Sequence, residues 1–101
     1  MISGGYNIYP KEVETEIDAL PGVVESAVYG VPDADLGEVV AAAVVLEPGA
    51  ATDADAIRAA LQDRLARFKI PRGIRIVPEL PRNAMGKVQK VELRKAATET
   101  A

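Results

Sequence analysis

The sequence contains no cysteine, no histidine and no tryptophan, and only one phenylalanine and three tyrosines among its 101 residues. Without cysteine the chain can form neither disulfides nor thiolate metal sites. Without histidine it has no imidazole base, no Cys–His pair and no imidazole ligand for zinc. Because aromatic residues are so few, the core must be built from Val, Ile, Leu and Ala. No apolar run approaches the ~20 residues of a membrane span and no signal peptide is visible, so we expect a cytoplasmic protein without a membrane partner.

Length and composition are typical of one small globular domain. Hydrophobic residues make up 49% of the chain and charged residues 27%, a balance that argues against disorder. We therefore expect residues 1–101 to fold as a single domain.

Charge is distributed unevenly along the sequence. Residues 1–57 contain eleven acidic side chains and one basic one, whereas residues 58–101 contain eleven basic and four acidic ones, giving formal charges of −10 and +7. This asymmetry suggests that the second half faces an anion. The alternative is that the two halves neutralise each other when they pack. Nucleic acid is not an expected partner, because the chain is acidic overall, lacks an aromatic stacking platform and matches no nucleic-acid module.

Hydrophobic spacing and turn residues divide the first half into one helix and two strands. Apolar side chains recur at helical spacing after a proline, and a Pro-Gly pair follows, which predicts a helix over residues 10–20. A β-branched stretch predicts a strand over residues 23–31. A nearly unbroken apolar run predicts a second strand over residues 39–46, buried on both faces. The short loop expected over residues 32–37 favours antiparallel pairing of these strands.

The second half is predicted to hold two helices around a third strand. An apolar stripe predicts a helix that begins at Thr52 or Asp53 and ends before Pro71. A strand over residues 73–77 follows and, after a long loop, a short helix over residues 91–97. The element order is α-β-β-α-β-α, which we interpret as an α+β fold: a small two-layer domain in which helices pack on a roughly three-stranded sheet.

The long loop predicted over residues 78–89 contains the strongest candidate for a reactive group, Lys87. This lysine follows Gly86 in a segment without helical or strand periodicity. A long cationic side chain on a mobile backbone could be carried into a site that another surface builds. The segment is not a phosphate-binding P-loop, because Pro81 stands where that motif has its first glycine and Val88 where it has Ser or Thr. The alternative is a solvated surface lysine.

Two further groups are candidates for ligand binding. The turn Ser3-Gly4-Gly5-Tyr6 would let a ligand run against the backbone and bond to exposed N–H groups, unless it is a plain hairpin turn. The second group is a set of basic side chains near the end of the second predicted helix. These cations either form a phosphate-binding patch or complement the helix dipole. They are Arg64, Arg67, Lys69 and Arg72.

Two long motifs stand near the two ends of the chain. Residues 2–14 read ISGGYNIYPKEVE, residues 80–90 read LPRNAMGKVQK, and the segments LPGV, GVPD, GE and FKIP lie between them. In this order they resemble the adenylate-forming acyl-CoA synthetases of the AMP-binding superfamily over essentially the whole chain. The resemblance implies that residues 1–101 are the mobile C-terminal lid domain of such an enzyme. The chain would begin just after the hinge residue, and the N-terminal domain that binds ATP and the acid would be absent.

The resemblance also implies a two-step ligase reaction with ATP and CoA as substrates. A small carboxylic acid would attack the α-phosphate of ATP and release pyrophosphate, and the CoA thiol would then displace AMP. Lys87 matches the family's adenylation lysine. In a second pose of the domain, Ser3, Gly4, Gly5 and Tyr6 would line the tunnel for the CoA pantetheine. Mg²⁺ is expected, bound mainly by the N-terminal domain.

Further expectations follow from the same resemblance. Arg64, Arg67 and Lys69 lie near positions where relatives place cationic contacts to the CoA phosphates. Family members are acylated on the adenylation lysine, so a lysine acyltransferase acting on Lys87 is a candidate partner. The residues of these motifs are most similar to those of malonyl-CoA synthetases, although the acid pocket would lie in the N-terminal domain. Three other interpretations stay open: a free-standing module that binds an anionic metabolite, a carrier-loading adenylation enzyme and a luciferase-type oxidase.

Overall fold

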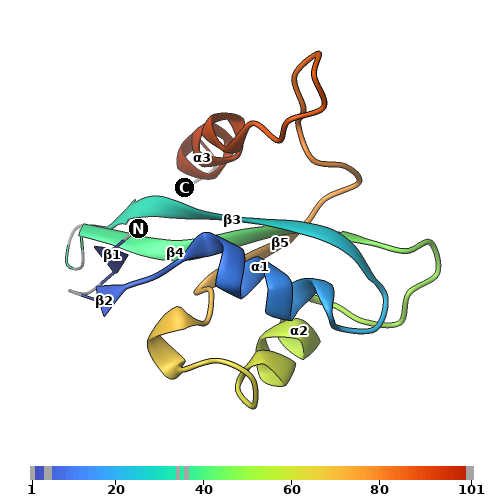
Figure 1. Cartoon of the computed structure of the whole chain (residues 1–101), viewed down its shortest axis with the longest axis horizontal. Coiled ribbons are helices and arrows are strands. Elements are labelled where there is room, and N and C mark those ends of the chain that lie inside the picture. The colour runs from blue at the N-terminus through green and yellow to red at the C-terminus, as the bar shows by residue number, and fades with distance from the viewer. Residues whose placement is uncertain (1, 4–5, 34, 36, 100–101) are drawn as a thin grey trace.

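The computed structural model describes residues 2–3, 6–33, 35 and 37–99. A short hairpin of β1 (Ile2–Ser3) and β2 (Tyr6–Asn7) precedes the elements that the sequence predicts (Figure 1). Those elements are α1 (Pro10–Asp18), β3 (Val23–Asp33), β4 (Gly37–Leu46), α2 (Ala54–Leu61), β5 (Gly73–Ile76) and α3 (Lys90–Glu99), with one turn of 3₁₀ helix, η1 (Arg67–Lys69), after α2. The predicted α+β class and the order α-β-β-α-β-α are confirmed.

The three longer strands form one sheet in the order β3-β4-β5. β3 and β4 are antiparallel, as predicted, whereas β5 runs parallel to β4 after the crossover through α2. β4 is the central strand, and residues 40–45 of it are buried without interruption. The predicted burial of this apolar run on both faces is confirmed, because side chains along a strand point alternately to its two sides.

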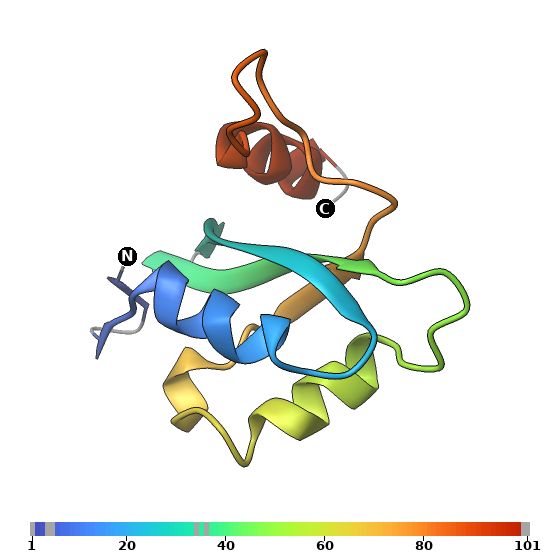
Figure 2. The ribbon, with the colours of Figure 1, turned by 45° about the vertical axis from the view of Figure 1, so that its right-hand side comes forward.

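Helices cover both faces of the sheet (Figures 1 and 2). α1 and α2 pack on one face, over the alternate β4 residues Val40, Ala42 and Val44. On the opposite face, Leu93 of α3 and Leu80 pack against the other β4 residues. The two-layer arrangement expected from the sequence therefore gains a third layer. The remaining buried members of the two clusters are Ile8, Val13, Ile17, Leu20, Val28, Ile57 and Leu61 in the first and Ala27, Tyr29, Ala41, Ala43 and Val45 in the second.

The loop between β3 and β4 is shorter than predicted. Pro32 pairs with Glu38 and Asp33 pairs with Gly37, so the two strands continue into most of the segment that its turn residues predict to be a loop. Proline is tolerated at this place because β3 lies at the edge of the sheet.

α2 begins where the sequence predicts. Of the two candidate capping residues, Asp53 caps the helix: its carboxylate accepts a hydrogen bond from the Ala56 amide at 2.8 Å. A carboxylate at this position satisfies an N–H group that has no partner inside the helix and suits the positive end of the helix dipole.

The same helix ends earlier than predicted, at Leu61 instead of near Pro71. An extended backbone at Ala66, with ψ of 145°, separates it from η1. The predicted apolar stripe is only partly realised, because Leu65 packs against the core but Phe68 is 39% exposed. Tertiary packing overrides the helical spacing here, since the early end lets the chain turn back and bury Pro71.

Candidate functional site

Lys87 lies on a hydrogen-bonded hairpin that projects from the side of the sheet covered by α3 (Figures 1 and 2). Arg82 and Val88 form an antiparallel bridge, and the Asn83 amide donates to the Lys87 carbonyl at 3.0 Å. The loop predicted over this segment does connect β5 to α3, but the sequence analysis did not predict the bridge within it. A single short bridge leaves no periodic pattern in the sequence.

The side chain of Asn83 closes the turn of this hairpin. Its Oδ1 atom accepts hydrogen bonds from the Met85 amide at 2.9 Å and from the Lys87 amide at 3.0 Å. Gly86 has a φ of 82°, a left-handed conformation that glycine adopts without steric cost. Asparagine at the start of the turn and glycine near its end are the sequence signals that would have predicted it.

The backbone around Lys87 is occupied by hydrogen bonds, whereas its side chain is free. The Lys87 carbonyl also accepts from Nε2 of Gln89 at 3.0 Å, and the preceding Gly86 carbonyl accepts from Nη1 of Arg82 at 2.8 Å. The lysine is exposed, and none of the carboxylates that the structure describes forms an ion pair with its ammonium group. Lys87 is therefore a flexible point charge on a fixed backbone.

The predicted glycine turn lies apart from this hairpin. Ser3 pairs with Tyr6 in the antiparallel β1–β2 ribbon, while Gly4 and Gly5 lie outside the described residues. In Figure 1 this ribbon lies beside one end of β4, and the Lys87 hairpin rises above the opposite side of the picture. The structure does not bring the two predicted sites together.

The predicted basic cluster is partly engaged with α1. Lys69 forms an ion pair with Glu12 at 2.5 Å, and Arg64 forms one with Glu16 at 3.4 Å. Arg67 is exposed and takes no part in either pair. Arg72, the fourth cation of the cluster, is likewise exposed and outside the described ion pairs, so Arg67 and Arg72 are the two that an added phosphate could meet without displacing a carboxylate.

Among the described residues, five ion pairs join an acid of the first half of the chain to a base of the second half. In each, the acid belongs to residues 1–57 and the base to residues 58–101. The interpretation in which the halves neutralise each other on packing is therefore correct for these side chains. The pairs are Asp55–Arg58, Glu16–Arg64, Glu12–Lys69, Glu25–Arg82 and Glu14–Lys90.

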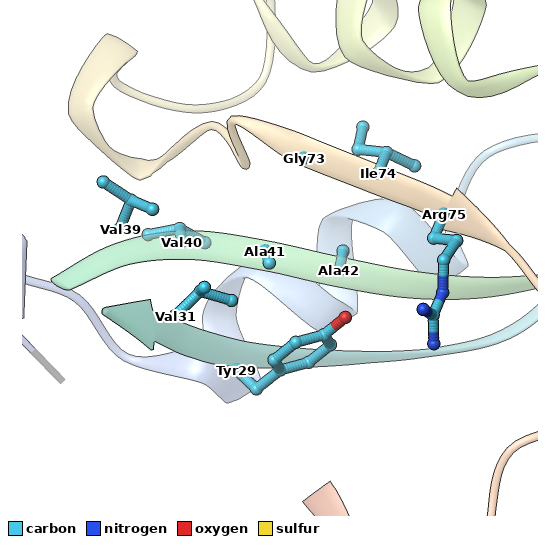
Figure 3. Close-up of a pocket in the computed structure, with 9 residues that line it drawn as sticks. All are labelled: Tyr29, Val31, Val39, Val40, Ala41, Ala42, Gly73, Ile74 and Arg75. Atoms are coloured by element: carbon cyan, nitrogen blue, oxygen red, sulfur yellow. The ribbon is translucent and has the colours of Figure 1, made fainter. Parts of the chain in front are cut away.

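A hollow of about 380 Å³ lies over the middle of the sheet (Figure 3). Its walls include Val31, Val39 and the ring of Tyr29, and its one charged lining residue is Arg75, whose Nε atom is buried without a hydrogen-bond partner. Burial raises the pKa of the Tyr29 phenol, and the Arg75 charge opposes this rise. None of the residues that the sequence analysis singles out lines this hollow.

The described part of the chain contains no group of three or more acidic side chains that could hold a metal ion. Within that same part, no helix is both long and apolar enough to cross a membrane.

The pattern of strands, helices and hairpin has a counterpart among known protein families. A family model described as the AMP-binding enzyme C-terminal domain matches residues 12–87. The chain belongs to this family. The match begins in α1 and ends at Lys87, so this AMP-binding C-terminal domain includes the whole sheet and most of the hairpin.

Several relatives of this AMP-binding C-terminal domain are named as CoA ligases or CoA synthases. The domain is 54% identical over 93 residues to the 3-[(3aS,4S,7aS)-7a-methyl-1,5-dioxo-octahydro-1H-inden-4-yl]propanoyl:CoA ligase of Rhodococcus jostii, a match over 92% of this chain and 18% of the relative. It is 46% identical over 95 residues to a feruloyl-CoA synthase of an Amycolatopsis species, over 94% of this chain and 19% of that protein. The crystal structure of ATP-bound MatB from Rhodopseudomonas palustris is similar with a TM-score of 0.94 at 53% identity, over 99% of this chain and 20% of that one. The domain thus spans about a fifth of the length of the proteins that it matches.

Proposed function

We propose that residues 1–101 are the mobile C-terminal lid domain of an ATP-dependent acid–CoA ligase. The enzyme would convert a carboxylic acid, ATP and CoA into acyl-CoA, AMP and pyrophosphate. The observation that carries this proposal is Lys87, an exposed ammonium without an ion pair among the described residues, on a hydrogen-bonded hairpin of a domain that several proteins named as CoA ligases share. Because those relatives are about five times longer, the remainder of the enzyme would hold the other substrate sites.

Lys87 would act in the first step, adenylate formation. A carboxylate that attacks the α-phosphate of ATP must overcome repulsion between two anions and adopt an in-line geometry. A positioned ammonium both neutralises the phosphate charge and orients the group. The loss of one such contact typically costs ~3–4 kcal/mol, a factor of about 10²–10³ in rate. The acidic side chains that the structure describes offer no metal site, so Mg²⁺ would be held with ATP by the N-terminal domain.

The second step would use the other end of the domain. The turn Ser3-Gly4-Gly5-Tyr6 would line the pantetheine tunnel after the lid has rotated. The position of the β1–β2 ribbon, away from the Lys87 hairpin in Figure 1, supports a rotation, because one nucleotide pocket cannot face both at once. Arg64, Arg67 and Lys69 would contact the CoA phosphates, and Arg64 and Lys69 would exchange their α1 carboxylates for phosphate on binding.

The acid that this enzyme activates would be selected outside the present chain. Relatives of comparable identity carry the names of very different acids, a fused-ring propanoate at 54% and ferulate at 46%, so this domain holds little information about the acyl group. Malonate is the first acid to test, because the motifs resemble malonyl-CoA synthetases. We further propose that a lysine acyltransferase acting on Lys87 switches the enzyme off by removing its charge, and that the enzyme is cytoplasmic.

The decisive experiment separates the two half-reactions in the full-length enzyme that carries this domain. In the Lys87→Ala variant, adenylate formation, measured by pyrophosphate release, is expected to fall about 10²–10³-fold. Thioester formation from a supplied acyl-adenylate should survive. Lys95→Ala is the matched control, because Lys95 is an exposed lysine on α3 outside the hairpin. Normal rates of both half-reactions in Lys87→Ala would refute the role of this residue.

A further inference from the structure

We propose that Arg82 and Lys90 are positioning residues that anchor the two ends of the Lys87 hairpin and thereby set where the ammonium group can reach. This inference rests on the proposed role of Lys87 in adenylate formation. Neither residue needs to touch a substrate. Each acts through contacts with the body of the domain, and the two contacts lie on either side of Lys87 in the sequence.

Arg82 connects the turn before Lys87 to the sheet. Its Nη1 atom donates to the Gly86 carbonyl at 2.8 Å, and its Nη2 atom forms an ion pair with the carboxylate of Glu25 in β3. The Gly86 carbonyl belongs to the peptide unit that leads directly into Lys87. One planar guanidinium therefore fixes that peptide unit and ties it to the edge strand.

Lys90 holds the other end, where the hairpin runs into α3. Its ammonium group pairs with Oε2 of Glu14 at 2.8 Å, and the same oxygen accepts a hydrogen bond from the Val28 amide of β3 at 2.8 Å. The Glu14 side chain is only 15% exposed, so this pair is screened less than a surface pair. Lys90 is the first residue of α3, where the helix dipole disfavours a cation. The Glu14 carboxylate supplies the charge that offsets this unfavourable position.

Both anchors attach the hairpin to the same edge of the sheet. Glu25 belongs to β3, and Glu14 is bound to the β3 amide of Val28, so the hairpin is fastened to one strand at two points. The tip itself makes no comparable apolar contact, since Met85 is 92% exposed. Leu80 and Val88 hold the base of the hairpin against the core, so the role of the two charged contacts is to fix the direction in which the tip extends from that base. A displacement of about 1 Å at a reacting group can cost about 10²-fold in rate.

The test uses the full-length ligase with Arg82→Met and Lys90→Met, two changes that keep the apolar stem and remove the charged head. We expect kcat for adenylate formation to fall about ten- to 100-fold, with the KM for ATP changed less than about threefold. Thioester formation from supplied acyl-adenylate should be unchanged. Lys90→Arg should recover much of the activity, and Arg82→Lys should recover less, because an ammonium lacks the planar fork that reaches both Gly86 and Glu25. Lys95→Met, which removes an exposed charge from α3 away from both anchors, should behave as the unchanged enzyme.

Glu25→Gln provides an independent variant in case Arg82→Met does not fold, because it weakens the same ion pair from the β3 side. It should also slow adenylate formation selectively. The inference is overturned if adenylate formation stays normal in the methionine variants, or if both half-reactions fall by the same factor together with the melting temperature. A normal rate in Lys87→Ala would refute the proposed function itself. A collapse in Lys87→Ala beside normal rates in the anchor variants would refute only the positioning roles.

Discussion

Lys87 combines a fixed backbone with a flexible side chain. The amide and carbonyl groups around it are already bonded, so only its side-chain torsions have to be ordered when the ammonium reaches a phosphate. Ordering a lysine side chain costs up to about 2 kcal/mol, and each backbone residue that had to be ordered as well would add about 1–2 kcal/mol. The hairpin therefore lowers the entropic cost of bringing the ammonium to its target.

Titration of the Tyr29 phenol should make the unfolding free energy depend on pH. Its side chain is 2% exposed, and burial raises the pKa of its phenol above the ordinary 10.0 despite the opposing charge of Arg75. As pH rises past about 10, the unfolded chain loses the phenol proton before the folded chain does, so the unfolding free energy falls. Below that pH both states are neutral and the contribution is constant.

The comparison needs urea unfolding of three proteins between pH 9 and pH 11. The unchanged protein should lose stability more steeply than Tyr29→Phe, in which this proton is absent. Tyr9→Phe is the control, because it makes the same chemical change at a residue that is 64% exposed. Equal slopes for all three would show that Tyr29 titrates as it does in the unfolded chain.

At the scale of elements, local pattern predicted most of the fold and missed what depends on contacts between distant segments. The apolar run of β4 and the Pro-Gly stop after α1 carry strong local signals, and the bounds of β3, β4, β5, α1 and α3 lie within two residues of those predicted. The early end of α2 depends on packing that follows Leu61, which helical spacing does not encode. The Lys87 hairpin depends on the Asn83 side chain and on Arg82 pairing with Glu25, 57 residues away. The sequence therefore predicted the candidate residue but not its anchors.

The N-terminal cap of α2 provides a stability test for one element. Asp53→Ala removes the acceptor of the Ala56 amide and should lower the unfolding free energy by about 1 kcal/mol. In a domain of this size, that loss corresponds to about 4–8 °C in melting temperature. Asp63→Ala removes the same charge just beyond the other end of α2 and should change stability by less than about 0.5 kcal/mol. An equal loss of stability in the two variants would contradict a specific contribution of the Asp53 cap, because the helix dipole disfavours a carboxylate at the end where Asp63 lies.

At the scale of the whole molecule, opposite charge holds segments together that lie far apart in the sequence. Glu12 and Glu16 on α1 pair with Lys69 and Arg64, which follow α2. The segregation of acids and bases along the chain thus has a structural role before any ligand is considered. An anion that binds Lys69 or Arg64 must compete with the carboxylates of α1. Anion binding at these two side chains is therefore linked to the stability of the domain.

The contribution of these ion pairs to stability can be measured separately from the effect of net charge. Glu12→Gln with Glu16→Gln changes the formal net charge from −3 to −1. Weaker self-repulsion alone would then stabilise the protein, whereas lost ion pairs should destabilise it by about 0.5–1 kcal/mol. The control Glu47→Gln with Asp63→Asn makes the same charge change at exposed residues outside the five ion pairs.

In urea unfolding at low salt, the Glu12/Glu16 variant should be the less stable of the two. The difference should shrink at about 1 M NaCl, where exposed charges are screened within about 3 Å. Equal stability of the two variants at low salt would mean that the Glu12 and Glu16 ion pairs contribute nothing measurable to stability.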